Sequence, residues 1–133
     1  MNSQPPLRPS CPPGTCTCRR EELLETPGAD VRILMLTRHE ERRLLERLEN
    51  VQSLDDLERV QQRMLGQLGI RMTIAPGHNE VRSMRGIAIE FAEQPGLCRK
   101  TRPAIAAAVR RGLDSHPEIA WRLLDAHDLL GGA

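Results

Sequence analysis

Aromatic residues and an excess of one charge are what this sequence most clearly lacks. Phe91 and Trp121 are the only aromatic residues, and 19 basic side chains stand against 18 acidic ones. A chain with a formal net charge of +1 has no overall field that would draw it to nucleic acid or to an anionic membrane. The sequence also lacks an apolar run of about 18 residues, so it predicts no membrane-spanning helix.

The first residues of the sequence do not have the pattern of a secretory leader. The first twenty residues contain no apolar core of the kind that signal peptides have. We therefore expect a cytoplasmic protein, in which cysteines are thiols or metal ligands rather than disulfides.

The length of 133 residues suits one domain. Residues 1–16 are polar and rich in proline, and such a segment has too few apolar side chains to form a core of its own. We expect a proline-rich, flexible tail over 1–16 and a single globular domain over 17–133.

Two helices are predicted in the middle of the chain, each opened by a capping box. Thr37 pairs with Glu40 in the first, and Ser53 pairs with Asp56 in the second. Gly69 is placed to end the second helix. The apolar positions that follow the caps recur every three or four residues: Leu44, Leu45, Leu48 and Val51, then Leu54, Leu57, Val60, Met64 and Leu68.

Beyond Gly69 the apolar period changes to two, which is typical of half-buried strands. Ile70, Met72 and Ile74 alternate with polar residues, and a second alternation ends at Phe91. These runs predict an antiparallel hairpin over about 70–92, and the short apolar run at 31–36 is a possible further strand. The fold class is therefore α+β, with a small antiparallel sheet packed by about four to five helices.

The last third of the chain predicts two more helices. Thr101 is expected to cap the first, whose alanine-rich run from 104 to 113 would let it approach a neighbour closely. A third capping box, Ser115 with Glu118, is expected to open the second. Trp121, on that last helix, is predicted to pack in the core or at an interface.

Four cysteines form the first candidate site. Cys11, Cys16 and Cys18 fall within a span of eight residues near the start of the sequence. Cys98 follows eighty residues after Cys18. A soft metal prefers several thiolates at roughly tetrahedral separation. We expect Cys11, Cys16, Cys18 and Cys98 to bind zinc, with an iron–sulfur cluster or unligated thiols as alternatives. Four histidines are alternative fourth ligands: His39, His78, His116 and His127.

A cationic helix start forms the second candidate site. Residues 94–113 carry five positive charges and only neutral residues otherwise, and four residues open the predicted helix there: Arg99, Lys100, Thr101 and Arg102. Unsatisfied amides at a helix start attract anions, so these residues are candidates for binding a phosphorylated ligand or an RNA backbone. The alternatives are a solvated face and internal pairing with acidic residues between 40 and 58.

These features favour a small, non-enzymatic binding or regulatory module over an enzyme. The sequence contains no G-x-S-x-G, H-E-x-x-H or G-x-G-x-x-G motif. The leading hypothesis is a module whose N-terminal tail is tied to the body by a cysteine-ligated metal. The alternatives are an anion- or RNA-backbone-binding protein that uses residues 99–103, and a protein–protein adaptor, including a homodimer.

Overall fold

A computed structural model describes residue 8, residues 18–76 and residues 86–131, with side chains described as far as residue 126. The elements in chain order are α1 (Arg20–Glu25), the 3₁₀ helix η1 (Arg32–Met35), α2 (Arg38–Glu49), α3 (Leu54–Arg63), the π-helical turn η2 (Met64–Leu68), β1 (Met72–Pro76), β2 (Ile87–Phe91), α4 (Thr101–Ser115) and α5 (Pro117–Gly131). Five α-helices and a two-stranded antiparallel sheet in these ranges confirm the predicted α+β class.

Helices α2 and α3 begin at the predicted caps. The Thr37 hydroxyl accepts a hydrogen bond from the Glu40 amide, and the Ser53 hydroxyl accepts one from the Asp56 amide. The predicted apolar stripe of α3 turns inward, with Leu57, Val60 and Met64 buried. Gly69 ends η2 in the left-handed conformation, at φ +72°. The predicted cap and the predicted end of this helix are confirmed.

The sheet has the predicted antiparallel pairing. Met72 lies opposite Phe91, and Ile74 lies opposite Ile89. The inward positions Met72 and Ile74 are buried while Thr73 is exposed, as the alternation predicts. The ladder is shorter than the predicted hairpin, and the turn predicted near residues 76–79 falls mostly in 77–85, outside the described residues.

The strand predicted over 31–36 is wrong, because this segment forms η1. The Asp30 carboxylate accepts a hydrogen bond from the Arg32 amide at 3.1 Å. This bond starts a tight turn rather than an extended chain. Ile33 and Leu34 are neighbours and both are 0 % exposed, whereas a strand sends successive side chains to opposite faces. The Arg32 guanidinium then donates to carbonyls of η2, those of Leu65 and Gly66.

Two details of the C-terminal helices also differ from the sequence prediction. Lys100 takes the N-cap position of α4, so Thr101 is the first helical residue and not its cap. Ser115 is the last residue of α4 and α5 begins at Pro117, so the third capping box is wrong. Proline fits the first helical position because the amide there has no partner in the helix.

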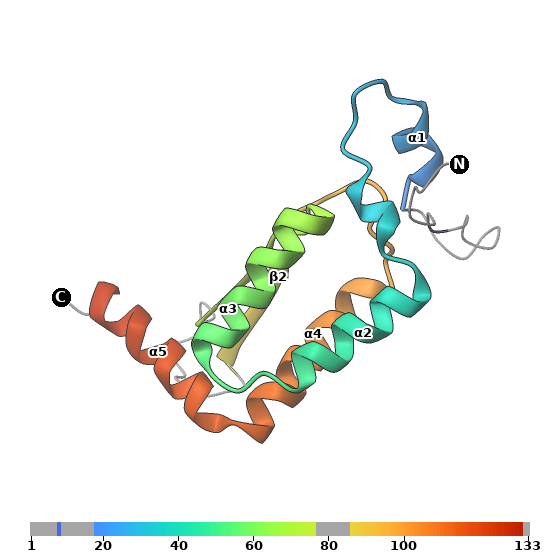
Figure 1. Ribbon diagram of the computed structural model, residues 1–133. Coiled ribbons are helices and arrows are strands. Elements are labelled where there is room, and N and C mark those ends of the chain that lie inside the picture. The colour runs from blue at the N-terminus through green and yellow to red at the C-terminus, as the bar shows by residue number, and fades with distance from the viewer. Residues whose placement is uncertain (1–7, 9–17, 77–85, 132–133) are drawn as a thin grey trace.

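Figure 1 shows α4 running beside α2, while α3 lies along the sheet and α5 reaches away at the far end. The small residues of α4 allow the close approach to α2, since a Cβ on Gly112 would lie 2.5 Å from the Leu48 carbonyl oxygen. The core between these layers is apolar, with Leu23, Ile33, Leu48, Leu57, Leu97, Ile105 and Ile119 among its buried side chains.

Candidate functional site

The structure places Cys18 beside the turn that precedes Cys98. The Gly96 amide donates a hydrogen bond to the Cys18 carbonyl oxygen at 2.5 Å, although the two cysteines are eighty positions apart in the sequence. Both cysteine side chains are half-buried. Two of the four predicted metal ligands therefore belong to backbone segments that are hydrogen-bonded to each other.

The turn is held there by packing as well as by that hydrogen bond. Gly96 has φ +89°, and a Cβ at this position would lie 2.6 Å from Ile33 Cγ2 and 2.9 Å from Leu23 Cδ2. The neighbouring Leu97 is 2 % exposed. The turn therefore packs between α1 and η1. This packing brings Cys98 towards the N-terminal part of the chain.

Arg8 ties the N-terminal segment to the same region. Its amide donates to the Leu34 carbonyl oxygen at 2.6 Å, and its carbonyl accepts a hydrogen bond from Arg20 Nε at 3.1 Å. Its guanidinium lies 3.6 Å from Cys18 Sγ. Arg8 therefore contacts Cys18, η1 and α1 at once.

The other predicted ligands lie either outside the described residues or on other elements. Cys11, Cys16 and His78, and the side chain of His127, lie outside the described residues. His39 lies on α2 and His116 between α4 and α5. Over the described ranges, no group of three or more His, Cys, Asp or Glu residues has the arrangement of a metal site. The zinc prediction therefore remains a prediction.

Two of the five positive charges between residues 94 and 113 make internal contacts, and both lie in the second half of α4 rather than at its start. Arg110 donates to the Ile87 carbonyl oxygen at 3.0 Å, and Arg111 forms an ion pair of 2.5 Å with Glu49 of α2. The internal pairing with residues 40–58 that the sequence allowed is thus present for Arg111. Of the four predicted anion ligands, Arg99 and Lys100 are exposed, Arg102 is half-buried and Thr101 is 7 % exposed. Binding of an anion by these four residues stays a prediction.

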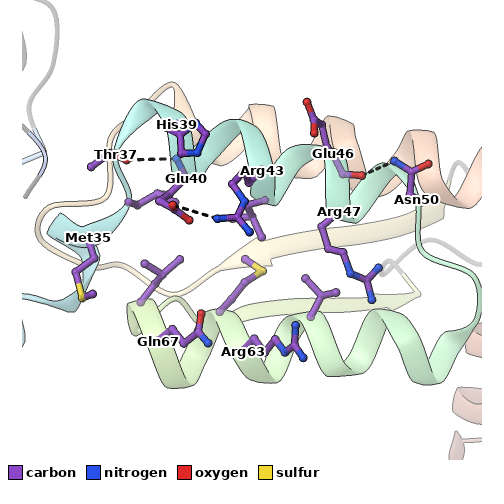
Figure 2. Close-up of a pocket in the computed structure, with 15 residues that line it drawn as sticks. Met35, Thr37, His39, Glu40, Arg43, Glu46, Arg47, Asn50, Arg63 and Gln67 are labelled. Atoms are coloured by element: carbon purple, nitrogen blue, oxygen red, sulfur yellow. Dashed lines mark hydrogen bonds and ion pairs between the residues drawn. The ribbon is translucent and has the colours of Figure 1, made fainter. Parts of the chain in front are cut away.

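A second candidate site, which the sequence analysis missed, is a groove of about 910 Å³ between α2 and the continuous α3–η2 helix. Leu36, Leu44, Val60, Met64 and Leu68 make its floor apolar. Met35 and a set of polar and charged residues line the rest of it, namely Thr37, His39, Glu40, Arg43, Glu46, Arg47, Asn50, Arg63 and Gln67. In Figure 2 the Arg47 side chain extends from α2 towards α3, and Glu46 points away from the groove.

Charges inside the groove are only partly balanced. Glu40 lies 3.5 Å from Arg43, and Arg47 holds Asp56 with both guanidinium Nη atoms. The Arg63 side chain makes no hydrogen bond or ion pair with any described residue. The groove therefore offers cationic side chains above an apolar floor.

The Arg47–Asp56 pair closes the end of the groove where α2 passes into α3. The Arg47 guanidinium and then the Gln52 amide stabilise the carboxylate and lower the pKa of Asp56 from 3.8 to about 2. The Asp56 side chain is only 13 % exposed. This carboxylate stays charged at neutral pH and joins the two walls of the groove.

The apolar stripes of α2 and α3 were readable from the sequence, but a groove depends on how closely the two helices pack. α2 packs chiefly on α4 and much less on α3, and no local pattern encodes that arrangement.

Comparisons with protein-family models, with curated proteins and with solved structures gave no match to this chain. In the part of the chain that the structure describes, no helix is both long enough and apolar enough to cross a membrane.

Proposed function

We propose that this chain is a small cytoplasmic, non-enzymatic binding module whose N-terminal segment is tied to its body by a metal ion. The observation that carries the proposal is the hydrogen bond between the Gly96 amide and the Cys18 carbonyl. It makes one cysteine of the N-terminal group a spatial neighbour of the turn that leads into Cys98. Without such a contact, Cys98 would have no reason to share a metal with the tail.

The ligand chemistry favours zinc. Four thiolates, from Cys11, Cys16, Cys18 and Cys98, form the donor set of a closed structural zinc site. An iron–sulfur cluster takes the same four donors and is the alternative metal centre. In either case the binding free energy orders the ligands, so the metal contributes directly to the stability of the N-terminal segment.

The test is the metal content and the free-thiol count of the full chain, purified without chelator or metal affinity resin. We expect about one zinc per chain and thiols that react only after the protein unfolds. Cys98→Ser should release the metal and expose the remaining thiols. Thr17→Ser, a matched change between two predicted ligands, should leave both readings unchanged.

Three results would decide against zinc in this role. Iron together with visible absorbance would indicate an iron–sulfur cluster instead of zinc. The proposed tether would then stand with a different metal centre. Metal-free protein with four reactive thiols would remove the proposal. Zinc that survives Cys98→Ser would place it on other ligands and separate it from the turn at 96–98.

A further inference from the structure

A second exposed surface on this molecule lies on the outer face of α5. Trp121 is 53 % exposed and was expected in the core or at an interface. Glu118 lies three residues before it and Asp125 four residues after it, and both are exposed. Helical spacing places these three side chains on one face, which we call the tryptophan face.

The opposite side of α5 fixes the direction of this face. Ile119, Ala120, Leu123 and Leu124 are at most 6 % exposed and belong to the core. The tryptophan face therefore points away from its own molecule. Exposed tryptophans are enriched among the residues that dominate protein interfaces, because they combine a large apolar area with little conformational entropy to lose.

The groove between α2 and α3–η2 has complementary chemistry. Its floor is apolar, and Arg43, Arg47 and Arg63 line it. Arg43 is paired with Glu40 and Arg47 with Asp56, whereas the Arg63 side chain has no partner among the described residues and carries the groove's unbalanced charge. Glu46, a further acid of α2, points its side chain away from the groove in Figure 2. Arginine guanidinium groups bind carboxylates and also stack on the indole ring of tryptophan.

The dimensions of the two surfaces agree. Seven helical steps from Glu118 to Asp125 span about 10 Å along α5. The lining residues of α2 run from Thr37 to Asn50, which at the helical rise covers about 20 Å. The tryptophan face is thus short enough to lie within the groove, with its indole over the floor and a carboxylate on either side.

We infer that a second copy of this chain docks its tryptophan face into the groove between α2 and α3–η2. Within one molecule the two surfaces cannot meet, because α5 is anchored with that face outward. The contact is head-to-tail, so in a pair one copy keeps a free groove and the other copy keeps a free tryptophan face. Such a contact builds open chains or a closed ring rather than a symmetric dimer.

The experiment uses two variants of the full chain, each of which disables one surface. Trp121→Ala removes the anchor and keeps the groove, whereas Arg63→Glu reverses a groove charge and keeps the face. The mass of each protein is measured by sedimentation and light scattering from about 10 µM to about 1 mM, the range of weak association. Circular dichroism and thermal unfolding confirm that each variant is folded.

We expect the wild-type mass to rise with concentration beyond that of a dimer, while each variant alone stays a monomer. An equimolar mixture of the two variants should form a dimer and no larger species, because only one intact groove and one intact face remain per pair. Arg42→Glu is the matched control, since Arg42 is exposed on α2 and does not line the groove, and this variant should associate like the wild type.

Each other outcome overturns the inference. A wild-type chain that remains monomeric at all concentrations tested would show that a second copy does not bind in the groove. Association that persists in both variants uses another interface. An Arg63→Glu variant that still associates, while Trp121→Ala does not, would show that tryptophan faces pair with each other. Variants that are monomeric alone and also fail to combine would show that the intact groove and the intact face do not bind each other. None of these results bears on the metal content, so they do not affect the proposed tether.

Discussion

Gly112 and Gly66 both lie in helices, but a methyl group would meet very different surroundings at the two positions. Gly112 lies where α4 approaches α2, and a Cβ there would be 2.5 Å from the Leu48 carbonyl oxygen and 3.1 Å from Val51 Cγ2. Gly66 is exposed in η2, and a Cβ there would meet no atom within 4 Å.

We predict opposite effects for alanine at these two positions. Gly112→Ala should lower the free energy of unfolding by about 2 kcal/mol, because the backbone of α2 has to move. Gly66→Ala should raise it by about 0.5–1 kcal/mol, since alanine is the better helix former and meets open space. Urea unfolding of both variants measures this, and equal effects of the same sign would contradict the close approach of α4 and α2.

At the scale of elements, a charged side chain joins α2 to α3. Asp56 lies in the first turn of α3 and accepts hydrogen bonds from Arg47 of α2 and from the Gln52 amide of the connection. These bonds lower its folded pKa from 3.8 to about 2. Since folding lowers this pKa, the stability it contributes is present above pH 4 and is lost as the pH falls from about 4 to 2.

We predict that Asp56→Asn lowers the free energy of unfolding by about 1 kcal/mol at pH 7, after allowance for solvent screening at this partly exposed site. The difference from the wild type should shrink between pH 4 and 2, as followed by urea unfolding at each pH. Asp55→Asn, an exposed neighbour in the same helical turn, is the control and should change stability much less. A pH-independent difference would show that the Arg47 pair does not act through the charge of Asp56.

At the scale of the whole molecule, the chain joins its N-terminal part to the turn at 96–98 through a glycine. Gly96 needs both its positive φ and the absence of a side chain, because Leu23 and Ile33 fill the adjacent space. Gly28 also has a positive φ, +74°, but a Cβ there would meet no atom within 4 Å.

We predict that Gly28→Ala costs about 1 kcal/mol from backbone strain alone. Gly96→Ala should cost about 3 kcal/mol, because strain and steric overlap add. Amide hydrogen exchange should also quicken at Leu23 in the Gly96 variant and remain unchanged there in the Gly28 variant. Equal costs would mean that the turn does not pack tightly against α1 and η1.

The sequence was informative where a structural choice depends on near neighbours. The caps at Thr37 and Ser53, the glycine end at Gly69 and the alternation in β1 follow from contacts within about four residues. The errors at 31–36 and at Ser115 arose where one local preference overrode another. The Asp30–Arg32 hydrogen bond starts a turn in place of a strand, and Pro117 takes the first helical position in place of the predicted capping box. For the candidate sites, the sequence selected the cysteines and the cationic stretch and missed the groove.

The order of residues by itself determined the α+β class, the amphipathic faces of α2 and α3 and the supply of thiols for a metal. Only the tertiary structure decided that Cys18 lies beside the turn before Cys98, that Trp121 faces outward and that a groove lies between α2 and α3–η2. The physical reason is the range of the interactions. Capping and periodicity act over one or two helical turns, whereas these arrangements depend on which surfaces, far apart along the chain, bury each other.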